Sequence, residues 1–226
     1  MRAIEEISSK EKGAYMTEGK MKKAEELTAL LNELPDVKKC TLYGSLAYGG
    51  GDALSDIDIE VDVSGVDNGR FVLKLANELR KKGLSVFYED YAPSLAPEKY
   101  VVSLALDEND PFLVADLNCT ARPHRATVER GELKEKNDPV SHTLKVWTAN
   151  LKHFVRGADC RGDILRMAER CGVEWAQHKS NKTLLEEVLV WLEAEAPAEQ
   201  RAFVLSCRNA FEQLTGRGSV WKQDII

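Results

Sequence analysis

The sequence predicts an α/β protein in which a mixed-sheet core is followed by an all-helical bundle. Three observations carry this prediction. Runs with the texture of β-strands dominate residues 38–119, helical periodicity alone follows from about residue 141, and the polar segment GELKEKNDP separates the two. We therefore expect one α/β domain at 1–130 and a helical domain at 140–226.

Two helices are predicted in the first domain. In residues 16–35, apolar side chains recur at helical spacing and the pattern ends before Pro35. In residues 69–83, a stripe of large apolar side chains is followed by Gly83, a residue type common just after a helix. The stripe consists of Phe71, Leu75 and Leu79. Both stretches are therefore assigned as helices with one apolar face.

Five short strands are predicted for the same domain. They are expected at 38–44, 56–63, 84–90, 99–106 and 111–119. The last two contain YVVSLAL and FLVADLN and are joined by a polar loop that begins at Asp107, which predicts an antiparallel hairpin. The strands together are expected to form a mixed sheet.

The second domain is predicted to be a bundle of about four helices. Ser141 is the expected N-cap of the first helix, in which Leu144, Trp147 and Leu151 share one face. The remaining helices are expected at 164–175, 184–192 and 198–214. The acidic, proline-containing EAEAPAE is the loop between the last two.

Composition and charge bound the class of protein. Of 226 residues, 43% are hydrophobic and 30% are charged, a balance typical of a globular domain. The formal net charge is −6, whereas sequence-independent binding to long nucleic acid depends on clustered Lys and Arg. Long nucleic acid is therefore not expected as a partner. The composition leaves the oligomeric state open.

The cysteines and the N-terminal segment predict the compartment. Five cysteines are scattered, odd in number and never spaced as C-x-x-C, which is typical of reduced thiols. The first twenty residues carry charges throughout and lack an apolar run, so no signal peptide is expected. No stretch approaches the roughly 20 apolar residues of a membrane span. We therefore expect a cytoplasmic protein without a membrane partner.

A glycine-rich segment, YGSLAYGGGDALSDIDIEV at residues 43–61, is the most informative part of the chain. Gly44 and Ser45 follow a predicted strand, and three further glycines make a loop free of side chains. Such a loop can bring backbone N–H groups close to a phosphate, and Ser45 adds a hydroxyl. The segment lacks the lysine of a P-loop and the third glycine of the dinucleotide-binding fingerprint, which excludes both motifs.

Carboxylates follow the glycines. Asp56 and Asp58 are two residues apart on a predicted strand, so they share a face and their backbones lie roughly 6.6 Å apart. A third acid, Asp116, stands between Ala115 and Leu117 in another apolar strand. Neighbouring carboxylates repel unless a cation lies between them, and Mg²⁺ takes one or two carboxylates together with phosphate oxygens. The three acids predict a two-metal site for displacement at phosphorus.

The order of these residues resembles a known family. Gly44-Ser45, ten further residues, Asp56-Ile57-Asp58-Ile59 and a later Asp116 resemble the nucleotidyltransferase superfamily with the DNA polymerase beta-type catalytic core. The resemblance covers about residues 38–120. The helical second half is similar, in texture and size alone, to that of aminoglycoside nucleotidyltransferases of the kanamycin and streptomycin type.

The resemblance implies a role for each residue. Gly44 and Ser45 would hold the β- and γ-phosphates of a nucleoside triphosphate. Asp56 and Asp58 would bind Mg²⁺, and Asp116 would help to hold a second Mg²⁺ and lower the pKa of the attacking hydroxyl. A nucleoside monophosphate would pass to that hydroxyl with release of pyrophosphate.

The expected function is therefore a Mg²⁺-dependent transfer of a nucleoside monophosphate to a hydroxyl of a small molecule. An aminoglycoside-like antibiotic is one such acceptor, which would make the protein an antibiotic-resistance enzyme. Two alternatives stay open: an antitoxin-like transferase that modifies a protein or RNA, and a nucleotide-binding module without catalysis. The helical half argues against the first alternative, and the complete set of acids argues against the second. The nucleobase is not specified.

Other polar residues have simpler interpretations. Glu89 is a weak candidate for a general base, because an ordinary acidic strand end explains it better. Lys145 and Lys152, seven residues apart on one predicted helix, are expected to be solvated. Glu60 and Asp62 continue the strand face of Asp58 and are expected to line a solvent-facing edge.

Overall fold

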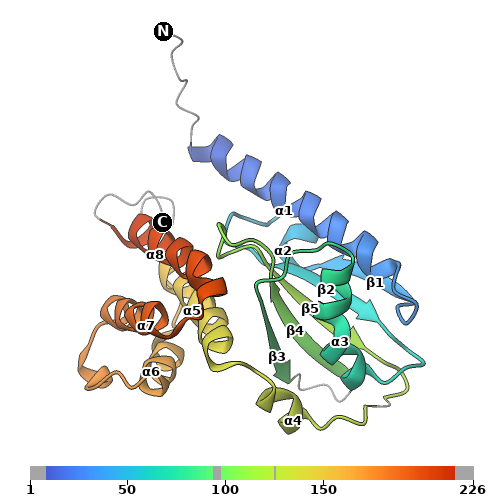
Figure 1. Ribbon diagram of the computed structural model, residues 1–226. Coiled ribbons are helices and arrows are strands. Elements are labelled where there is room, and N and C mark those ends of the chain that lie inside the picture. The colour runs from blue at the N-terminus through green and yellow to red at the C-terminus, as the bar shows by residue number, and fades with distance from the viewer. Residues whose placement is uncertain (1–8, 94–97, 125, 217–226) are drawn as a thin grey trace. The chain divides into compact units, whose positions relative to one another are not determined.

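The computed structural model describes residues 9–93, 98–124 and 126–216, which belong to two compact units (Figure 1). The first unit comprises 1–86, 91–106 and 112–135, and the second comprises 87–90, 107–111 and 136–226. The division thus falls between Glu135 and Lys136, with two short segments of the first half counted to the second unit. The first eight residues of the charged N-terminal segment, where no signal peptide is expected, lie outside the described residues.

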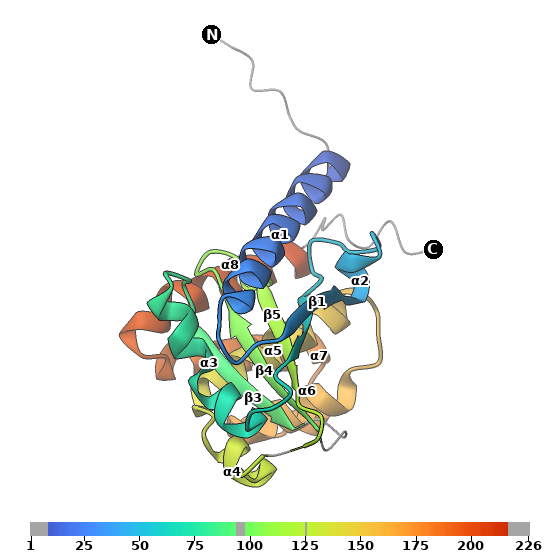
Figure 2. The ribbon, with the colours of Figure 1, turned by 90° about the vertical axis from the view of Figure 1, so that its right-hand side faces the viewer.

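The strands form one five-stranded mixed sheet in the order β1-β2-β5-β4-β3, which confirms the predicted fold class. The strands are β1 Lys39–Tyr43, β2 Ile57–Asp62, β3 Tyr88–Pro93, β4 Lys99–Ala105 and β5 Val114–Thr120. β1 is antiparallel to β2, β2 is parallel to β5, and β5 is antiparallel to β4 in the predicted hairpin. Figure 2 shows the same strands from a second direction.

Strand β3 begins later than predicted. Residues 84–87 were expected to be part of it, but they lead from the preceding helix to Tyr88 without strand pairing. The Leu84 N–H donates to the Leu79 carbonyl at 3.1 Å, the bond that closes a helix C-terminus. The Arg80 guanidinium then donates to the Val86 carbonyl at 3.2 Å. These bonds hold the segment beside the helix end, so its β-like composition does not produce a strand.

Side chains alternate across β2 and give the sheet an apolar face and a polar face. The apolar set is fully buried: Ile57, Ile59 and Val61. The polar set is half-buried: Asp58, Glu60 and Asp62. Helices α1 (Ser9–Asn32) and α3 (Asn68–Lys81) contribute their leucines to the same core as the apolar set (Figure 1). The candidate acids therefore lie on the face of β2 that does not form this core.

Glu60 and Asp62 do not mark a sheet edge, which corrects the expectation from sequence. Strand β2 is an interior strand between β1 and β5. The Thr120 hydroxyl donates to Glu60 Oε1 at 2.5 Å, and Lys99 Nζ lies 3.1 Å from Glu60 Oε2. Asp62 accepts a hydrogen bond from the Ser64 N–H at 2.8 Å. The acidic residues at every second position of β2 therefore belong to a polar face of the sheet, where other polar side chains surround them.

The second unit contains a bundle of four long helices, as predicted. They are α5 Pro139–Val155, α6 Arg161–Arg170, α7 Asn181–Glu195 and α8 Arg201–Thr215. Short helices accompany the two units: α2 Gly44–Ala47, α4 Arg130–Glu135, η1 Ala176–His178 and η2 Ala198–Gln200. Trp147 is fully buried in the bundle, and its indole N–H donates to the Leu185 carbonyl at 2.8 Å. The predicted apolar face of α5 therefore forms the core of this unit.

Two helix ends differ from the prediction. α5 is capped by Asp138, whose carboxylate accepts from the Ser141 N–H at 2.8 Å, so Ser141 lies inside the helix. Pro139 occupies the first turn, where no N–H partner is needed. α6 ends at Arg170, five residues before the predicted end at Trp175, which is exposed. The Val173 N–H closes this helix on the Ala168 carbonyl at 3.0 Å.

The five cysteines are all free, as predicted. Burial raises the pKa of the Cys119 and Cys207 thiols, so both stay protonated at neutral pH and pack as small apolar side chains. Within the described ranges, no helix combines the length and the apolar character needed to cross a membrane.

Candidate active site

Strand register places two of the predicted acids directly opposite each other. Asp58 on β2 pairs with Asp116 on the parallel strand β5, and paired residues point to the same sheet face. The row continues to Tyr43, opposite Asp58 on β1, and to Ser103, opposite Asp116 on β4. Four adjacent strands therefore present Tyr43, Asp58, Asp116 and Ser103 in one line across the polar face.

Asp56 lies at the same end of the strands. It is half-buried and immediately precedes β2, one residue outside the strand in which it was predicted. The Asp52 carboxylate accepts from the Leu54 N–H and the Ser55 hydroxyl, each at 2.9 Å, and these bonds form the turn that ends the glycine loop. Because β2 and β5 are parallel, their N-terminal ends meet, and all three predicted acids come to one end of this strand pair.

Gly44 packs directly against Asp58. Its φ angle is 72°, in the left-handed region that side chains other than glycine rarely adopt. A Cβ atom at this position would overlap Asp58 Oδ2 and lie 3.0 Å from Asp58 Cγ. The close approach of the α2 backbone to the carboxylate therefore requires glycine, on two independent grounds.

Ser45 is exposed at the second position of α2. Its carbonyl accepts from the Gly50 N–H at 2.9 Å, and the Leu46 carbonyl accepts from the Gly49 N–H at 3.3 Å. These bonds fold the glycine loop back onto α2. Of the two predicted phosphate-binding residues, Gly44 packs against Asp58, and Ser45 follows it in the same short helix.

The donor set fits a hard divalent cation. Asp56, Asp58 and Asp116 carry carboxylate oxygens, which are the ligands that Mg²⁺ prefers. Among the described residues, no three His, Cys, Asp or Glu side chains are already gathered as a group that could hold a metal ion. Mg²⁺ usually takes only one or two protein carboxylates and completes its octahedron with phosphate and water oxygens. The arrangement therefore fits an ion that binds together with a triphosphate.

Tyr43 and Asn118 flank the acids and were missed by sequence analysis. The Asn118 amide donates to the Tyr43 hydroxyl. Burial, followed by the negative charges of Asp58, Glu60 and Asp116, raises the pKa of Tyr43 to about 12. The Tyr43 phenol therefore stays neutral at physiological pH. Its raised pKa also reports a concentration of negative charge on this face, the condition under which a cation is attracted.

Alkaline pH is expected to destabilise the protein through two side chains of β1, Cys40 and Tyr43. Burial raises the pKa of Cys40 from 9.0 to about 11, and that of Tyr43 rises from 10.0 to about 12. Because both pKa values are higher in the folded chain, folding holds these protons more tightly. The resulting stability is fully present below about pH 9 and is lost as pH rises to about 12.

Urea unfolding measured at a series of pH values checks this expectation. The midpoint should be flat just below pH 9 and should fall above it. A Tyr43→Phe variant should lose less stability than wild type between about pH 10 and 12. Parallel curves for the two proteins in that range would show that Tyr43 does not titrate as described.

Lys20 is a buried lysine that sequence analysis also missed. Its ammonium group is buried and donates to the carbonyls of Ser55 and Phe112, at 2.7 Å each. Ser55 precedes Asp56, and Phe112 lies shortly before β5. Lys20 therefore ties together the two segments that lead into the acid-bearing strands. Residues four apart in a helix share a face, and Lys20 lies four residues before the buried Ala24 of α1. This spacing was the sequence feature that could have indicated that Lys20 is buried.

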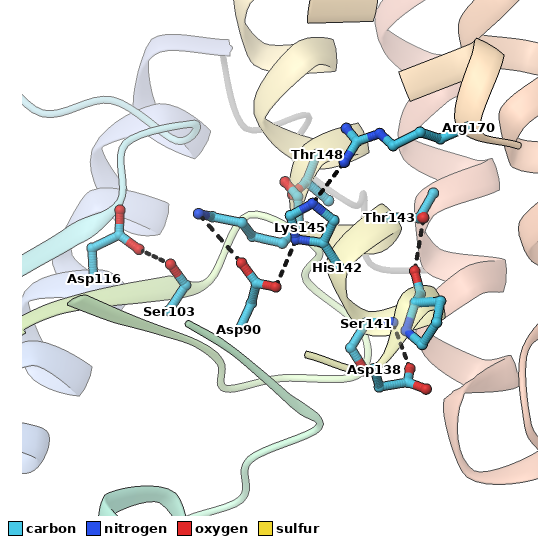
Figure 3. A network of polar contacts seen from close by, with 11 residues as sticks. Asp90, Ser103, Asp116, Asp138, Ser141, His142, Thr143, Lys145, Thr148 and Arg170 are labelled. Atoms are coloured by element: carbon cyan, nitrogen blue, oxygen red, sulfur yellow. Dashed lines mark hydrogen bonds and ion pairs between the residues drawn. The ribbon is translucent and has the colours of Figure 1, made fainter. Parts of the chain in front are cut away.

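The second unit contains a charged cluster around the buried Asp90 (Figure 3). Asp90 Oδ1 lies 2.8 Å from His142 Nδ1, and Asp90 Oδ2 lies 3.6 Å from Lys145 Nζ. Arg170 Nη1 lies 2.9 Å from His142 Nε2. A guanidinium can only donate, so His142 Nε2 accepts and the imidazole proton is on Nδ1, where it is donated to Asp90.

This cluster corrects the expectation of solvated lysines. Lys145 pairs with Asp90, and Lys152 is buried. Glu89, the weak candidate for a general base, is half-buried on β3 next to Asp90, and its role stays a prediction. Asp90, which sequence analysis did not select, makes charged contacts with His142 and Lys145 within the second unit.

Comparison with known proteins gives matches only among solved structures. No protein-family model and no curated protein matches the chain. A structure of the RNA terminal uridylyl transferase Cid1 is 20% identical, covers 81% of this chain and 48% of its own, and gives a TM-score of 0.37. Cid1 poly(U) polymerase with Mg and 3'-dATP is 19% identical, covers 81% and 49%, and scores 0.36. The GLD-2/RNP-8 complex is 14% identical, covers 94% and 71%, and scores 0.33.

The chain spans about half the length of the Cid1 chains that it matches. TM-scores between 0.33 and 0.37 do not establish a common fold, so the case for this site rests on its own geometry. A mixed sheet with a Gly-Ser turn against one of two opposed acids is the arrangement expected of a nucleotidyltransferase core, the class that the sequence pattern resembles. The aminoglycoside part of that resemblance finds no support in these matches.

Proposed function

We propose that this protein is a Mg²⁺-dependent nucleotidyltransferase that moves a nucleoside monophosphate from a nucleoside triphosphate to an acceptor hydroxyl. The observation that carries the proposal is the pairing of Asp58 with Asp116 across parallel strands, with the Gly44 backbone packed against Asp58. Like charges directly opposite each other on a sheet destabilise it. A cation-binding role explains why such a pair is built into the polar face beside a glycine turn.

Each residue has a role in this proposal. Asp56 and Asp58 hold Mg²⁺, and Asp116 helps to hold a second ion. When bound, Mg²⁺ neutralises phosphate charge and lowers the pKa of the attacking hydroxyl. Gly44 and Ser45 bind the terminal phosphates through a backbone without a side chain and an exposed hydroxyl. The acceptor oxygen forms a bond to the α-phosphorus while the bond to pyrophosphate breaks, and the protein contributes mainly by positioning the reactants.

The acceptor is proposed only as a hydroxyl. A small molecule, including an aminoglycoside-like one, stays a prediction from the sequence. RNA is the substrate named for the Cid1 structures, and the expectation that long nucleic acid is not a partner finds no support there. An acceptor panel therefore needs both classes. The free thiols support the proposal of a cytoplasmic location.

A thermal-shift titration with ATP, GTP, CTP and UTP tests the proposal, each with Mg²⁺ and with EDTA. A triphosphate at 100 times its dissociation constant should stabilise the fold by about 2.7 kcal/mol, and only in the presence of Mg²⁺. Pyrophosphate release is then measured with short RNA and with aminoglycosides as acceptors. No Mg²⁺-dependent shift with any triphosphate would contradict the site. Binding without turnover on any acceptor would favour the non-catalytic module instead.

A further inference from the structure

The geometry points to Ser103 as a positioning residue for Asp116, a role that rests on the proposed function of the acids. Ser103 is the direct cross-strand partner of Asp116 in the β4–β5 hairpin. Its hydroxyl donates a hydrogen bond to Asp116 Oδ1, and the other carboxylate oxygen is turned away from it (Figure 3). We infer that this bond fixes the carboxylate in the orientation in which it holds a cation.

The buried surroundings of Ser103 require its hydroxyl to form a hydrogen bond within the protein. Ser103 is fully buried, and so are its neighbours Val102 and Leu104. A buried hydroxyl needs a hydrogen-bond partner, and an ionised carboxylate can only accept. The single hydroxyl proton of Ser103 is therefore committed to Asp116. A serine in the middle of the apolar run YVVSLAL is the sequence signal of this contact.

The opposed acids explain why positioning is needed. Asp58 and Asp116 face each other across β2 and β5, so repulsion favours rotation of the two carboxylates away from each other. The terminal torsion of an aspartate is broad and offers little resistance of its own. The Ser103 hydroxyl binds Asp116 Oδ1 on the side away from Asp58, so it fixes this torsion in one orientation. Because the carboxylate is held before a cation binds, less reorganisation is required on binding.

A second hydroxyl–carboxylate bond on the same face provides a matched control. The Thr120 hydroxyl donates to Glu60 Oε1 at 2.5 Å, and Thr120 lies four residues after Asp116 on β5. Thr120→Val and Ser103→Ala each remove one such bond from the polar face. A merely structural role predicts the same consequences for both variants. A positioning role predicts that only Ser103→Ala affects cation binding.

The experiment measures Mn²⁺ binding by electron paramagnetic resonance on the full chain, with and without a non-hydrolysable triphosphate. Ser103→Ala is expected to weaken Mn²⁺ binding by about 10- to 100-fold, the usual effect of removing a residue that orients a metal ligand. Thr120→Val should bind Mn²⁺ like wild type, and Ser103→Thr, which keeps the hydroxyl, should restore binding. Urea unfolding of each variant verifies that it is folded. Ser103→Cys, a weak donor of nearly the same size, should show an intermediate loss and serves if Ser103→Ala does not fold.

The outcomes separate the inference from the function on which it rests. Unchanged Mn²⁺ affinity in Ser103→Ala, or an equal loss in Thr120→Val, overturns the positioning role and leaves the proposed function in place. A wild-type protein that binds no Mn²⁺, with or without triphosphate, overturns the proposed function and the inference together. A selective loss in Ser103→Ala that Ser103→Thr repairs supports both.

Discussion

Asp58→Asn is expected to reduce nucleotidyl transfer by about 10²- to 10³-fold while the protein stays folded, the size of effect seen when one preorganised electrostatic group is removed. The substitution keeps the shape of the side chain and removes its charge. It thereby removes half of the opposed pair with Asp116 on β5. Because that pair is repulsive without a cation, its loss should not lower the free energy of unfolding.

Asp62→Asn is the matched control for this variant. It makes the same chemical change on the same strand and the same face, four residues and about 13 Å further along β2. An asparagine there can still accept the hydrogen bond of the Ser64 N–H. Pyrophosphate release at saturating Mg²⁺ and triphosphate should be normal for Asp62→Asn. Turnover by Asp58→Asn within a few-fold of wild type would remove Asp58 from the site.

The contrast between Asp58 and Asp116 shows what the sequence can predict of this site. The carboxylates and the Gly44-Ser45 turn could be predicted from the local sequence. Carboxylates within apolar strands and clustered glycines between secondary-structure elements are both uncommon. The pairing register of β2 and β5, which sets Asp58 opposite Asp116, could not be predicted from the sequence. β2 and β5 are parallel, and α3, β3 and β4 lie between them in the chain, so their pairing depends on packing of distant segments.

Lys20 and Ser103 show why the residues that hold the acid-bearing segments in place were not predicted from the sequence. Each is a single polar residue among the apolar residues of one helix face or one strand. A prediction from apolar spacing depends on the apolar residues and gives the polar one no role. Lys20 binds carbonyls 35 and 92 residues away, and no local pattern encodes such partners. Ser103 meets Asp116 because of the hairpin register, which depends on loop geometry. Polar contacts over long sequence distances therefore become visible only in the fold.

Glu89 and Asp90 are successive residues of β3 with different surroundings. Successive side chains of a strand point to opposite faces of the sheet. The predicted strand began at 84, whereas β3 begins at Tyr88 because the end of α3 holds the preceding segment. Composition alone gave no reason to prefer Asp90. Its contacts with His142 and Lys145 distinguish it in the structure.

Gly44→Ala is expected to lower both stability and activity. The residue has a φ of 72°, and a non-glycine side chain in the left-handed region costs roughly 1–2 kcal/mol. The new methyl group would also overlap Asp58 Oδ2, so the carboxylate or the α2 backbone must move. A misplacement of about 1 Å in a catalytic arrangement costs on the order of 10²-fold in rate. Urea unfolding and pyrophosphate release measure the two effects separately.

Gly83→Ala distinguishes backbone strain from displacement of Asp58. Gly83 also has a positive φ, 90°, but a Cβ there would meet no atom within 4 Å. Its variant should therefore lose a comparable amount of stability to strain and retain transfer activity. If Gly44→Ala is no less active than Gly83→Ala, the glycine turn does not position Asp58. If only Gly44→Ala loses transfer and Mg²⁺-dependent triphosphate binding, the close approach of the turn to the carboxylate is what the site requires.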